Sequence, residues 1–337
     1  MPNPMIVPLE RIQAARELVS GRVHRTPMLS SASAAELVGR NGGPRLAEDR
    51  LYVKAEHLQL TGSFKPRGAL NRILALSPPE RERGIVTLSA GNAAQGFAWA
   101  ARGAGVHAVV VMPVGAVPSK VEACRGYGAE VVLHGTHVGE TLAKVEELVD
   151  ERGLLFTHPF DDPDVIAGYG SVGLEILDDL PEADVVVAGI GGGGLISGVA
   201  AALKERRPGV RVYGVEPIES NAVSLGLERG EPVSIQPHTV ADGLGAPFAG
   251  AWTLAMCARY VDGIELLDDP TILAGVRFAA ERMKQVLEPA GAAALAAVLF
   301  GRIPIRDGER VCVVASGGNV DLARLGAFFD QAAPLPA

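Results

Sequence analysis

The stretch Thr61-Gly62-Ser63-Phe64-Lys65-Pro66-Arg67-Gly68-Ala69 lies where a strand is expected to give way to a helix. The apolar run at residues 51–55 predicts a strand before it, and the apolar spacing over residues 69–74 predicts a helix after it. Pro66 would occupy the first helical turn, which tolerates proline because that N–H has no intrahelical partner. Lys65 is therefore expected at a strand-to-helix corner, partly removed from water.

Lys65 is the candidate nucleophile of this corner. It follows Phe64 and is surrounded in sequence by short side chains. Removal from water lowers the pKa of an amine, and a neutral lysine amine can form a Schiff base with an aldehyde. An ordinary surface lysine at a helix start is the alternative, and the corner alone does not exclude it.

Length and composition predict an ordinary globular protein of about two domains. The chain has 337 residues, of which 48% are hydrophobic and 21% charged. The net charge is −8 and no basic run is present, so neither nucleic acid nor an anionic membrane is an expected partner. Cys124, Cys257 and Cys312 lack metal-ligand spacing and predict reduced thiols in a cytoplasmic protein.

Strand and helix patterns alternate through the middle of the chain. Short β-branched runs separated by longer helical patterns predict a parallel sheet with helices on both faces. Residues 183–203 are almost free of charge, but their glycines predict a strand followed by a helix, not a membrane span. Strands are expected at residues 85–89, 107–112, 130–134, 154–157, 184–190, 210–216 and 310–315.

Residues 189–194, Gly-Ile-Gly-Gly-Gly-Gly, end one predicted strand and open a helix. Consecutive glycines let backbone N–H groups turn toward an anion, and the helix dipole favours a phosphate there. A tight turn without a ligand is the alternative, although four glycines in a row carry an entropic cost. The run also satisfies G-x-G-x-x-G, with Glu216 near the position of a ribose-binding acid, so an NAD(P)-dependent oxidoreductase is a second alternative. Against it, that fingerprint usually opens the first strand of its domain.

Two further corners follow predicted strands, at residues 89–96 and 315–319. Ser89, Asn92 and the N–H groups at a helix start predict a receptor for a small carboxylate, although a capping serine and a turn asparagine would look the same. Ligands of open parallel sheets bind beyond the carboxyl ends of the strands. We therefore expect all these corners and Lys65 on one edge, with an aldehyde at Lys65 and a phosphate at the glycine loop.

Together these motifs resemble the threonine dehydratase and serine racemase group of pyridoxal-phosphate (PLP) enzymes. The resemblance implies an α/β chain with the tryptophan synthase β-like PLP-dependent fold (fold type II), in which two open, twisted, mostly parallel sheets are flanked by helices. It implies a large PLP-binding domain of residues 1–50 and 155–337, a small inserted domain of residues 51–154, and a homodimer or homotetramer. The matching motifs lie at residues 61–69, 89–96, 158–168, 191–195, 288–291 and 316–319.

The resemblance also implies roles for individual residues. Lys65 would form the Schiff base beside Phe64, Asn92 would hydrogen-bond the ring hydroxyl of PLP, and Ser316 would face its pyridine nitrogen. The cofactor's phosphate would be bound by Gly191, Gly192, Gly193, Gly194 and Leu195. The substrate carboxylate would be held by Ser89, Ala90, Gly91, Asn92 and Ala93.

A serine opposite the pyridine nitrogen does not enforce its protonation, which makes the ring a weaker electron sink and favours β-elimination. The expected reaction is dehydration and deamination of a β-hydroxy amino acid, L-threonine or L-serine by default, to a 2-oxo acid and ammonia. Lys65 would then serve as the base on Cα–H. A threonine synthase-like or other PLP β-replacement enzyme is an alternative, and a non-catalytic phosphate-binding module is another.

Four positions depart from the family pattern. Ala90 stands where serine racemases carry a second serine, which predicts weak racemisation. Ala93 and Tyr169 replace a histidine and a glutamine of dehydratases, which leaves the identity of the β-hydroxy amino acid open. Ala222 removes a carboxylate from the racemase-type cation site at Glu216, so no metal site is expected.

Overall fold

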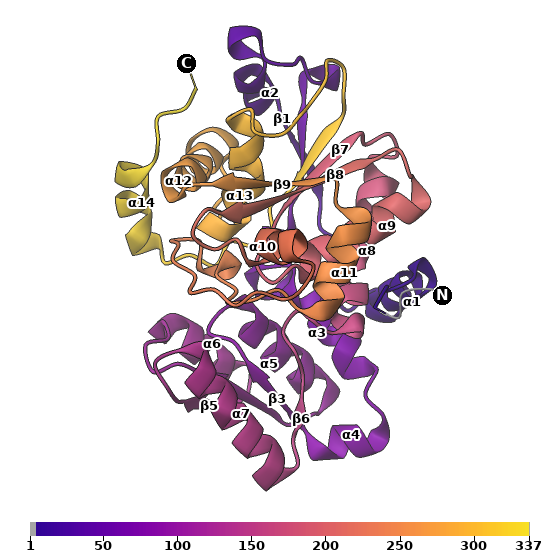
Figure 1. Cartoon of the computed structure of the whole chain (residues 1–337), viewed down its shortest axis with the longest axis vertical. Helices are drawn as coiled ribbons and strands as arrows, with labels where there is room; N and C mark the ends of the chain where they lie inside the picture. Colours follow the sequence, from indigo (N-terminus) through magenta and orange to yellow (C-terminus); the bar gives the residue numbers. More distant parts are fainter. Residues whose placement is uncertain (1–4, 337) are drawn as a thin grey trace.

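The computed structural model describes residues 5–336 and contains two mostly parallel β-sheets flanked by helices, as predicted. Figure 1 shows the six-stranded sheet in the upper half of the molecule and the four-stranded sheet in the lower half. The strand orders are β1-β2-β10-β7-β8-β9 and β5-β4-β3-β6. Each sheet with its helices forms one layered unit, and the chain runs from one unit to the other and back.

The six-stranded sheet is parallel except where β1 pairs antiparallel with β2. Its central strands β7 and β10 are buried along their whole length, which explains their continuous apolar sequences. The strands are β1 (Met28–Ser31), β2 (Leu51–Lys54), β10 (Val311–Val314), β7 (Val185–Gly189), β8 (Arg211–Pro217) and β9 (Gly263–Leu267).

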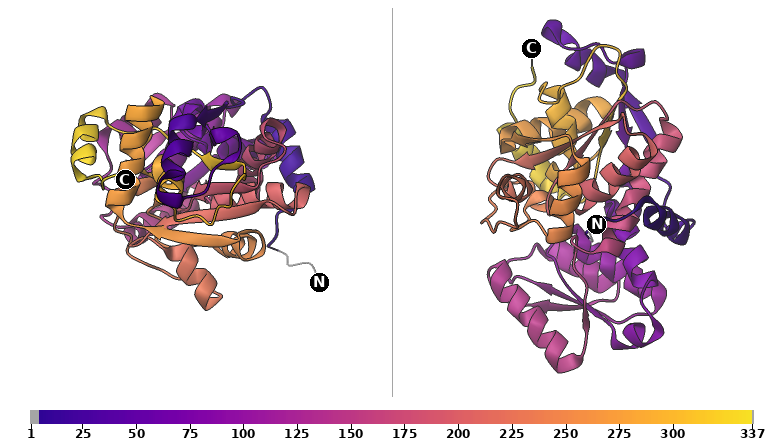
Figure 2. Two further views of the ribbon diagram at one scale, coloured as in Figure 1. Left: turned by 90° about the horizontal axis from the view of Figure 1, so that it is seen from above. Right: turned by 45° about the vertical axis from the view of Figure 1, so that its right-hand side comes forward.

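The four-stranded sheet is parallel throughout. Figure 2 shows this sheet and its helices lying against one end of the larger unit. Its strands are β3 (Ile85–Leu88), β4 (Ala108–Met112), β5 (Glu130–Leu133) and β6 (Leu155–Phe156), and its helices are α4 (Pro78–Arg83), α5 (Asn92–Ala104), α6 (Pro118–Gly126) and α7 (Val138–Arg152).

Strand pairing differs from the expected division of the chain at both ends of the inserted segment. The strand β2, expected to open the small domain, hydrogen-bonds β1 and β10 in the six-stranded sheet. The short strand β6, expected in the large domain, instead pairs with β3. The order of β2 and β6 in the sequence does not predict these partners, because each strand pairs with a strand that is distant in the sequence.

Three helices at the junction of the two units pack closely through glycines. α3 (Lys65–Leu74) lies against α8 (Pro163–Asp179), where a Cβ on Gly168 would come within 2.5 Å of the Arg67 carbonyl oxygen. A Cβ on Gly198 of α9 (Gly194–Arg206) would come within 2.3 Å of the Ile166 carbonyl oxygen of α8. The Lys65 corner is therefore held by backbone-to-backbone contact.

The remaining helices pack around the six-stranded sheet, some on its strands and others on helices. They are α1 (Leu9–Val19), α2 (Ala32–Val38), α10 (Ala222–Arg229), α11 (Ala251–Tyr260), α12 (Asp269–Phe278), α13 (Pro289–Leu299) and α14 (Leu325–Gln331). No helix within residues 5–336 is long and apolar enough to cross a membrane. The nearly uncharged segment 183–203 divides into β7 and α9, as the sequence predicts.

Candidate active site

Lys65 begins α3, and its amine lies against two aromatic rings. Nζ is 4.6 Å from the ring centroid of Phe64 and 5.5 Å from that of Tyr169. Within residues 5–336 no side chain or carbonyl forms a hydrogen bond or ion pair with this amine. Although the residue is only half-buried overall, its amine is removed from water, which lowers the pKa of Lys65 to about 8. The negative charge of Glu288 acts in the opposite direction and raises this pKa, but by less. A useful fraction of the amine is neutral near pH 7.

The position of Lys65 is fixed from two sides. A Cβ on Gly96 of α5 would lie 3.0 Å from the Lys65 Cβ, and a Cβ on Gly68 would lie 2.5 Å from the Tyr169 ring. The Phe64 and Tyr169 rings meet edge to face, with centroids 4.7 Å apart. Lys65 therefore stands on a helix that cannot shift without disturbing both α5 and α8.

The glycine loop follows β7 and opens α9. Gly193 has φ +90°, a conformation that favours glycine, and a Cβ on Gly192 would lie 2.4 Å from the Phe160 ring. Packing alone therefore requires glycine at these positions, whether or not a ligand binds there. No group within residues 5–336 accepts a hydrogen bond from the N–H groups of Gly191, Gly192 or Gly193. These donors at the positive end of a 13-residue helix suit a phosphate.

The corner at Ser316 lies beside the Lys65 corner. The Phe64 N–H donates to the Ser316 carbonyl at 3.1 Å, and Ser63 forms a β-bridge with Gly317. The Ser316 hydroxyl is 3.4 Å from the Ala290 carbonyl oxygen, and a Cβ on Gly189 would lie 3.2 Å from the same oxygen. The start of α13 thus links the Ser316 corner to the strand that carries the glycine loop.

Asn92 brings the corner at residues 89–96 to the same place. Its Oδ1 accepts a hydrogen bond from Asn319 at 2.9 Å, and its Nδ2 donates to Glu288 at 2.5 Å. Ser89 Oγ accepts the N–H of Gly91 at 3.1 Å, which shapes the loop around Ala90. The corners do meet, but at the facing edges of two sheets and not, as expected, on one edge of a single sheet.

Glu288 is a site residue that the sequence analysis did not assign a role. It is 2% exposed, and burial with the nearby Asp242 carboxylate raises its pKa to about 7, against the effects of Lys120, Asn92 and Lys65. Its Oε2 has no hydrogen-bond partner within residues 5–336. The signal available in the sequence was a single charge inside the apolar run of residues 286–300, where a carboxylate is expected only for a reason.

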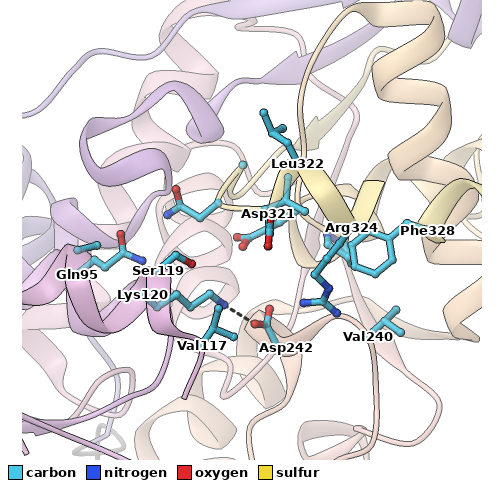
Figure 3. Close-up of a pocket in the computed structure, with 16 residues that line it drawn as sticks. Gln95, Val117, Ser119, Lys120, Val240, Asp242, Asp321, Leu322, Arg324 and Phe328 are labelled. Atoms are coloured by element: carbon cyan, nitrogen blue, oxygen red, sulfur yellow. Dashed lines mark hydrogen bonds and ion pairs between the residues drawn. The ribbon is translucent and has the colours of Figure 1, made fainter. Parts of the chain in front are cut away.

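A cavity of about 600 Å³ opens beside Glu288 and Asn319. Figure 3 shows Lys120, from α6 of the four-stranded unit, paired across it with Asp242 of the six-stranded unit. Asp321 and Arg324 also line this cavity. A charged chamber between the two units therefore adjoins the group of residues around Asn92.

Behind Lys65, a buried ionic network anchors α3. Arg67, which is fully buried, is bound through Nε to Glu56 at 2.8 Å and through Nη1 to Glu175 at 2.7 Å. Lys54 also pairs with Glu175, at 2.7 Å. Burial alone would lower the pKa of Arg67, but the two carboxylates raise it above its usual value. The guanidinium of Arg67 is therefore a permanent structural cation.

Glu216 does not stand free for a ribose or a metal. Its two carboxylate oxygens accept the N–H groups of Val223 and Ser224, each at 2.9 Å, and the Ser224 hydroxyl at 2.6 Å. Glu216 thus accepts hydrogen bonds from the first turn of α10. Because its carboxylate is already occupied in this way, it does not support a dinucleotide site. The described part of the chain, residues 5–336, holds no group of three or more His, Cys, Asp or Glu side chains placed to bind a metal.

Comparison with known proteins identifies the cofactor. Residues 19–317 match the family described as pyridoxal-phosphate-dependent enzymes. The chain belongs to this family. It is 42% identical to an L-threonine ammonia-lyase of Thermotoga maritima over 94% of this chain and 77% of that one. It is 39% identical to the L-threonine dehydratase catabolic TdcB of Escherichia coli (strain K12) over 95% of each.

Solved structures agree with this family assignment. The structure of maize serine racemase superposes with a TM-score of 0.88 at 33% identity, over 96% of this chain and 97% of that one. The predictions of a fold-type II PLP enzyme, of PLP as cofactor and of an ammonia-lyase class are confirmed. The individual roles of the site residues stay predictions.

The residues present fit PLP on structural grounds. The amine of Lys65 has no hydrogen-bond or ion-pair partner in the described residues and its pKa is lowered, as an amine that binds an aldehyde requires. The N–H groups of residues 191–193, which have no acceptor within residues 5–336, provide donors for a phosphate, and Ser316 follows β10 beside the Lys65 corner with its hydroxyl only weakly bonded. An aldehyde, a phosphate and a pyridine nitrogen each have a matching group.

Proposed function

We propose that the chain converts L-threonine or L-serine to a 2-oxo acid and ammonia by β-elimination. The observation that carries this proposal is the Lys65 amine, which has a lowered pKa and no partner among residues 5–336, at a helix start that hydrogen-bonds the Ser316 corner. Relatives named as threonine ammonia-lyase and threonine dehydratase, 39–42% identical over nearly the whole chain, support threonine as the first substrate to test.

PLP, when bound, supplies an electron sink for the substrate's Cα. We propose that Lys65 binds the cofactor's aldehyde carbon at rest and moves the Cα proton during turnover. Asn92 would donate to the ring hydroxyl, and the N–H groups of Gly191, Gly192, Gly193, Gly194 and Leu195 would hold the phosphate. Ser316 would meet the pyridine nitrogen with a neutral hydroxyl, which does not enforce a positive charge there.

The substrate would be held by its carboxylate at the loop from Ser89 to Ala93, where half-buried backbone precedes the start of α5. Loss of the Cα proton and of the β-hydroxyl, the latter as water, releases an enamine that hydrolyses to the 2-oxo acid and ammonia. Ala90 offers no proton on the other face of Cα, so we propose that racemisation is slow. Because Ala93 and the buried Tyr169 differ from the side chains of dehydratases near the expected substrate, a different β-hydroxy amino acid is an alternative substrate.

Product analysis tests this function against the alternatives. With L-threonine or L-serine we expect 2-oxo acid and ammonia in equal amounts and no dependence on NAD(P)H. Formation of a substituted amino acid when a thiol is added would instead identify a β-replacement enzyme. Turnover that required NAD(P)H would favour the oxidoreductase.

We also propose a cytoplasmic homodimer or homotetramer in which a small domain, built on the four-stranded sheet, is inserted into a larger one. Cys124, Cys257 and Cys312 are free and buried, and burial raises the pKa of each thiol to about 12, which supports unreactive, reduced cysteines. Sedimentation equilibrium of the holoenzyme gives the oligomeric state, and the 35.0 kDa mass of one chain would contradict the proposal.

A further inference from the structure

Asn92 is the middle of a chain of hydrogen bonds. Asn319 Nδ2 lies 2.6 Å from the Thr61 carbonyl oxygen and 2.9 Å from Asn92 Oδ1. Asn92 Nδ2 in turn lies 2.5 Å from Glu288 Oε1. Each of the four motifs that contain Lys65, Asn92, Glu288 and Ser316 contributes one residue. This chain of hydrogen bonds therefore connects the four motifs of the site.

The direction of this chain is fixed at its Thr61 end. A carbonyl oxygen can only accept, so the Asn319 atom that faces Thr61 must be its nitrogen. That same nitrogen faces Asn92, whose nearer atom must therefore be its oxygen. The nitrogen of Asn92 is then left to face Glu288. The order holds whether Glu288 is ionised or protonated, because it does not depend on the Glu288 end.

Two glycines make room for the chain. Gly62 has φ +74°, and a Cβ there would lie 2.2 Å from Asn319 Oδ1. A Cβ on Gly317 would lie 2.1 Å from Glu288 Oε1. Glycines of the Lys65 and Ser316 corners therefore make room for Asn319 and Glu288, the two side chains that hydrogen-bond Asn92, a role separate from any contact with a ligand.

We propose that Asn319 is a positioning residue that holds the Asn92 amide so that it presents an N–H, and not its carbonyl, to the ring hydroxyl of PLP. The Asn92 amide has two N–H bonds; Glu288 accepts one, and no group within residues 5–336 accepts the other. A flipped Asn92 amide would set its nitrogen against the Asn319 nitrogen, two donors with no acceptor between them. This inference rests on the proposed role of Asn92.

The test is a double-mutant cycle on the holoenzyme, with PLP affinity and the wavelength of the visible absorption band as readouts. Asn92→Ala is expected to weaken PLP binding about tenfold, as loss of one hydrogen bond to a charged oxygen predicts. Asn319→Ala is expected to weaken it by about threefold or more and to shift the band in the same direction. In the double variant Asn319→Ala should add nothing, because it acts only through Asn92.

Asn71→Ala is the matched control. Asn71 is a buried asparagine of α3, and its Nδ2 donates to the Asp164 carbonyl at 2.7 Å, away from the Asn92 chain. It should lower the unfolding temperature as Asn319→Ala does and leave PLP affinity and the band unchanged.

Two results would refute the positioning role of Asn319 without refuting the proposed role of Asn92. One is a wild-type affinity and band in Asn319→Ala while Asn92→Ala is altered. The other is an effect of Asn319→Ala that is as large without the Asn92 side chain as with it. Unchanged behaviour of Asn92→Ala would instead refute the proposed role of Asn92, and the inference with it. If Asn319→Ala does not fold, Asn319→Ser, which keeps one donor, goes through the same cycle.

Discussion

Lys65 and Arg67 stand two positions apart at the start of one helix, and their surroundings are opposite. The Arg67 guanidinium is fully buried and bound to two carboxylates, Glu56 and Glu175. The Lys65 amine lies beside the Phe64 and Tyr169 rings and forms no hydrogen bond or ion pair within residues 5–336. Burial lowers the pKa of both cations, but only Arg67 has partners that more than offset it.

The contrast separates anchoring from reactivity. A buried cation with partners on every side stays charged and holds its helix in place. A buried cation without partners loses its proton easily and becomes a nucleophile or base. The first turn of α3 carries one of each, so the ionic network behind the helix can position the reactive amine in front of it.

The largest expected effect is the loss of catalysis in Lys65→Ala. Removal of the amine takes away both the proposed bond to the cofactor and the proposed base for Cα–H, so turnover of L-threonine should fall by at least about a thousandfold. Circular dichroism should show a folded protein, because the amine has no hydrogen-bond or ion-pair partner in the part of the chain that the structure describes. Turnover at a wild-type rate would rule out the mechanism.

Arg67→Ala should do the reverse and act mainly on stability. Removing one partner of a buried ion pair costs about 3–5 kcal/mol, because uncompensated charges remain. Arg11→Ala is the control: Arg11 pairs with Asp164 at 2.6 Å near the surface, and loss of such a pair costs less than about 1 kcal/mol. Urea unfolding measures both. Equal losses in the two variants would mean that the buried network does not anchor α3.

The pH dependence of cofactor uptake sharpens the comparison at Lys65. Only the neutral amine attacks an aldehyde, so the rate of PLP incorporation into apoprotein should rise with pH and level off above about pH 8, where the pKa of Lys65 lies. A lysine with an ordinary pKa would keep gaining about tenfold per pH unit to beyond pH 10. A rate still climbing between pH 9 and 10 would contradict the lowered pKa.

The smallest expected effect is a gain of racemisation in Ala90→Ser. A hydroxyl at residue 90 would supply a proton donor on the face of Cα opposite Lys65, and chiral chromatography should detect some D-serine from L-serine. Elimination should remain the main reaction. If no D-amino acid forms, the opposite face lacks more than this one group.

Much of the site was predictable because its motifs are local. The strand before residues 189–194 and the helix after them follow from short apolar runs, and Pro66 marks the start of α3. These signals place the Lys65 corner and the glycine loop at strand ends. They depend on neighbours in sequence, which a single chain displays directly.

What the sequence could not predict depends on contacts between distant residues. β2 joins β10 across more than 250 residues, so its sheet could not be chosen from its own apolar run. Glu288 resembles an ordinary helix-capping residue, yet it accepts a hydrogen bond from Asn92 and caps nothing with its side chain. Gly317 makes room for Glu288, because a Cβ there would lie 2.1 Å from Glu288 Oε1. Only the folded arrangement reveals these roles.

The visible absorption spectrum of the purified protein, before and after addition of L-threonine, tests the central claim most directly. We predict a yellow protein, as the proposed covalent bond between Lys65 and PLP requires, and a shift of its visible band when threonine enters and reacts. A yellow protein with no shift would keep the cofactor and reject threonine as the substrate. A colourless protein, even after incubation with PLP, would contradict the role of Lys65 on which the account depends.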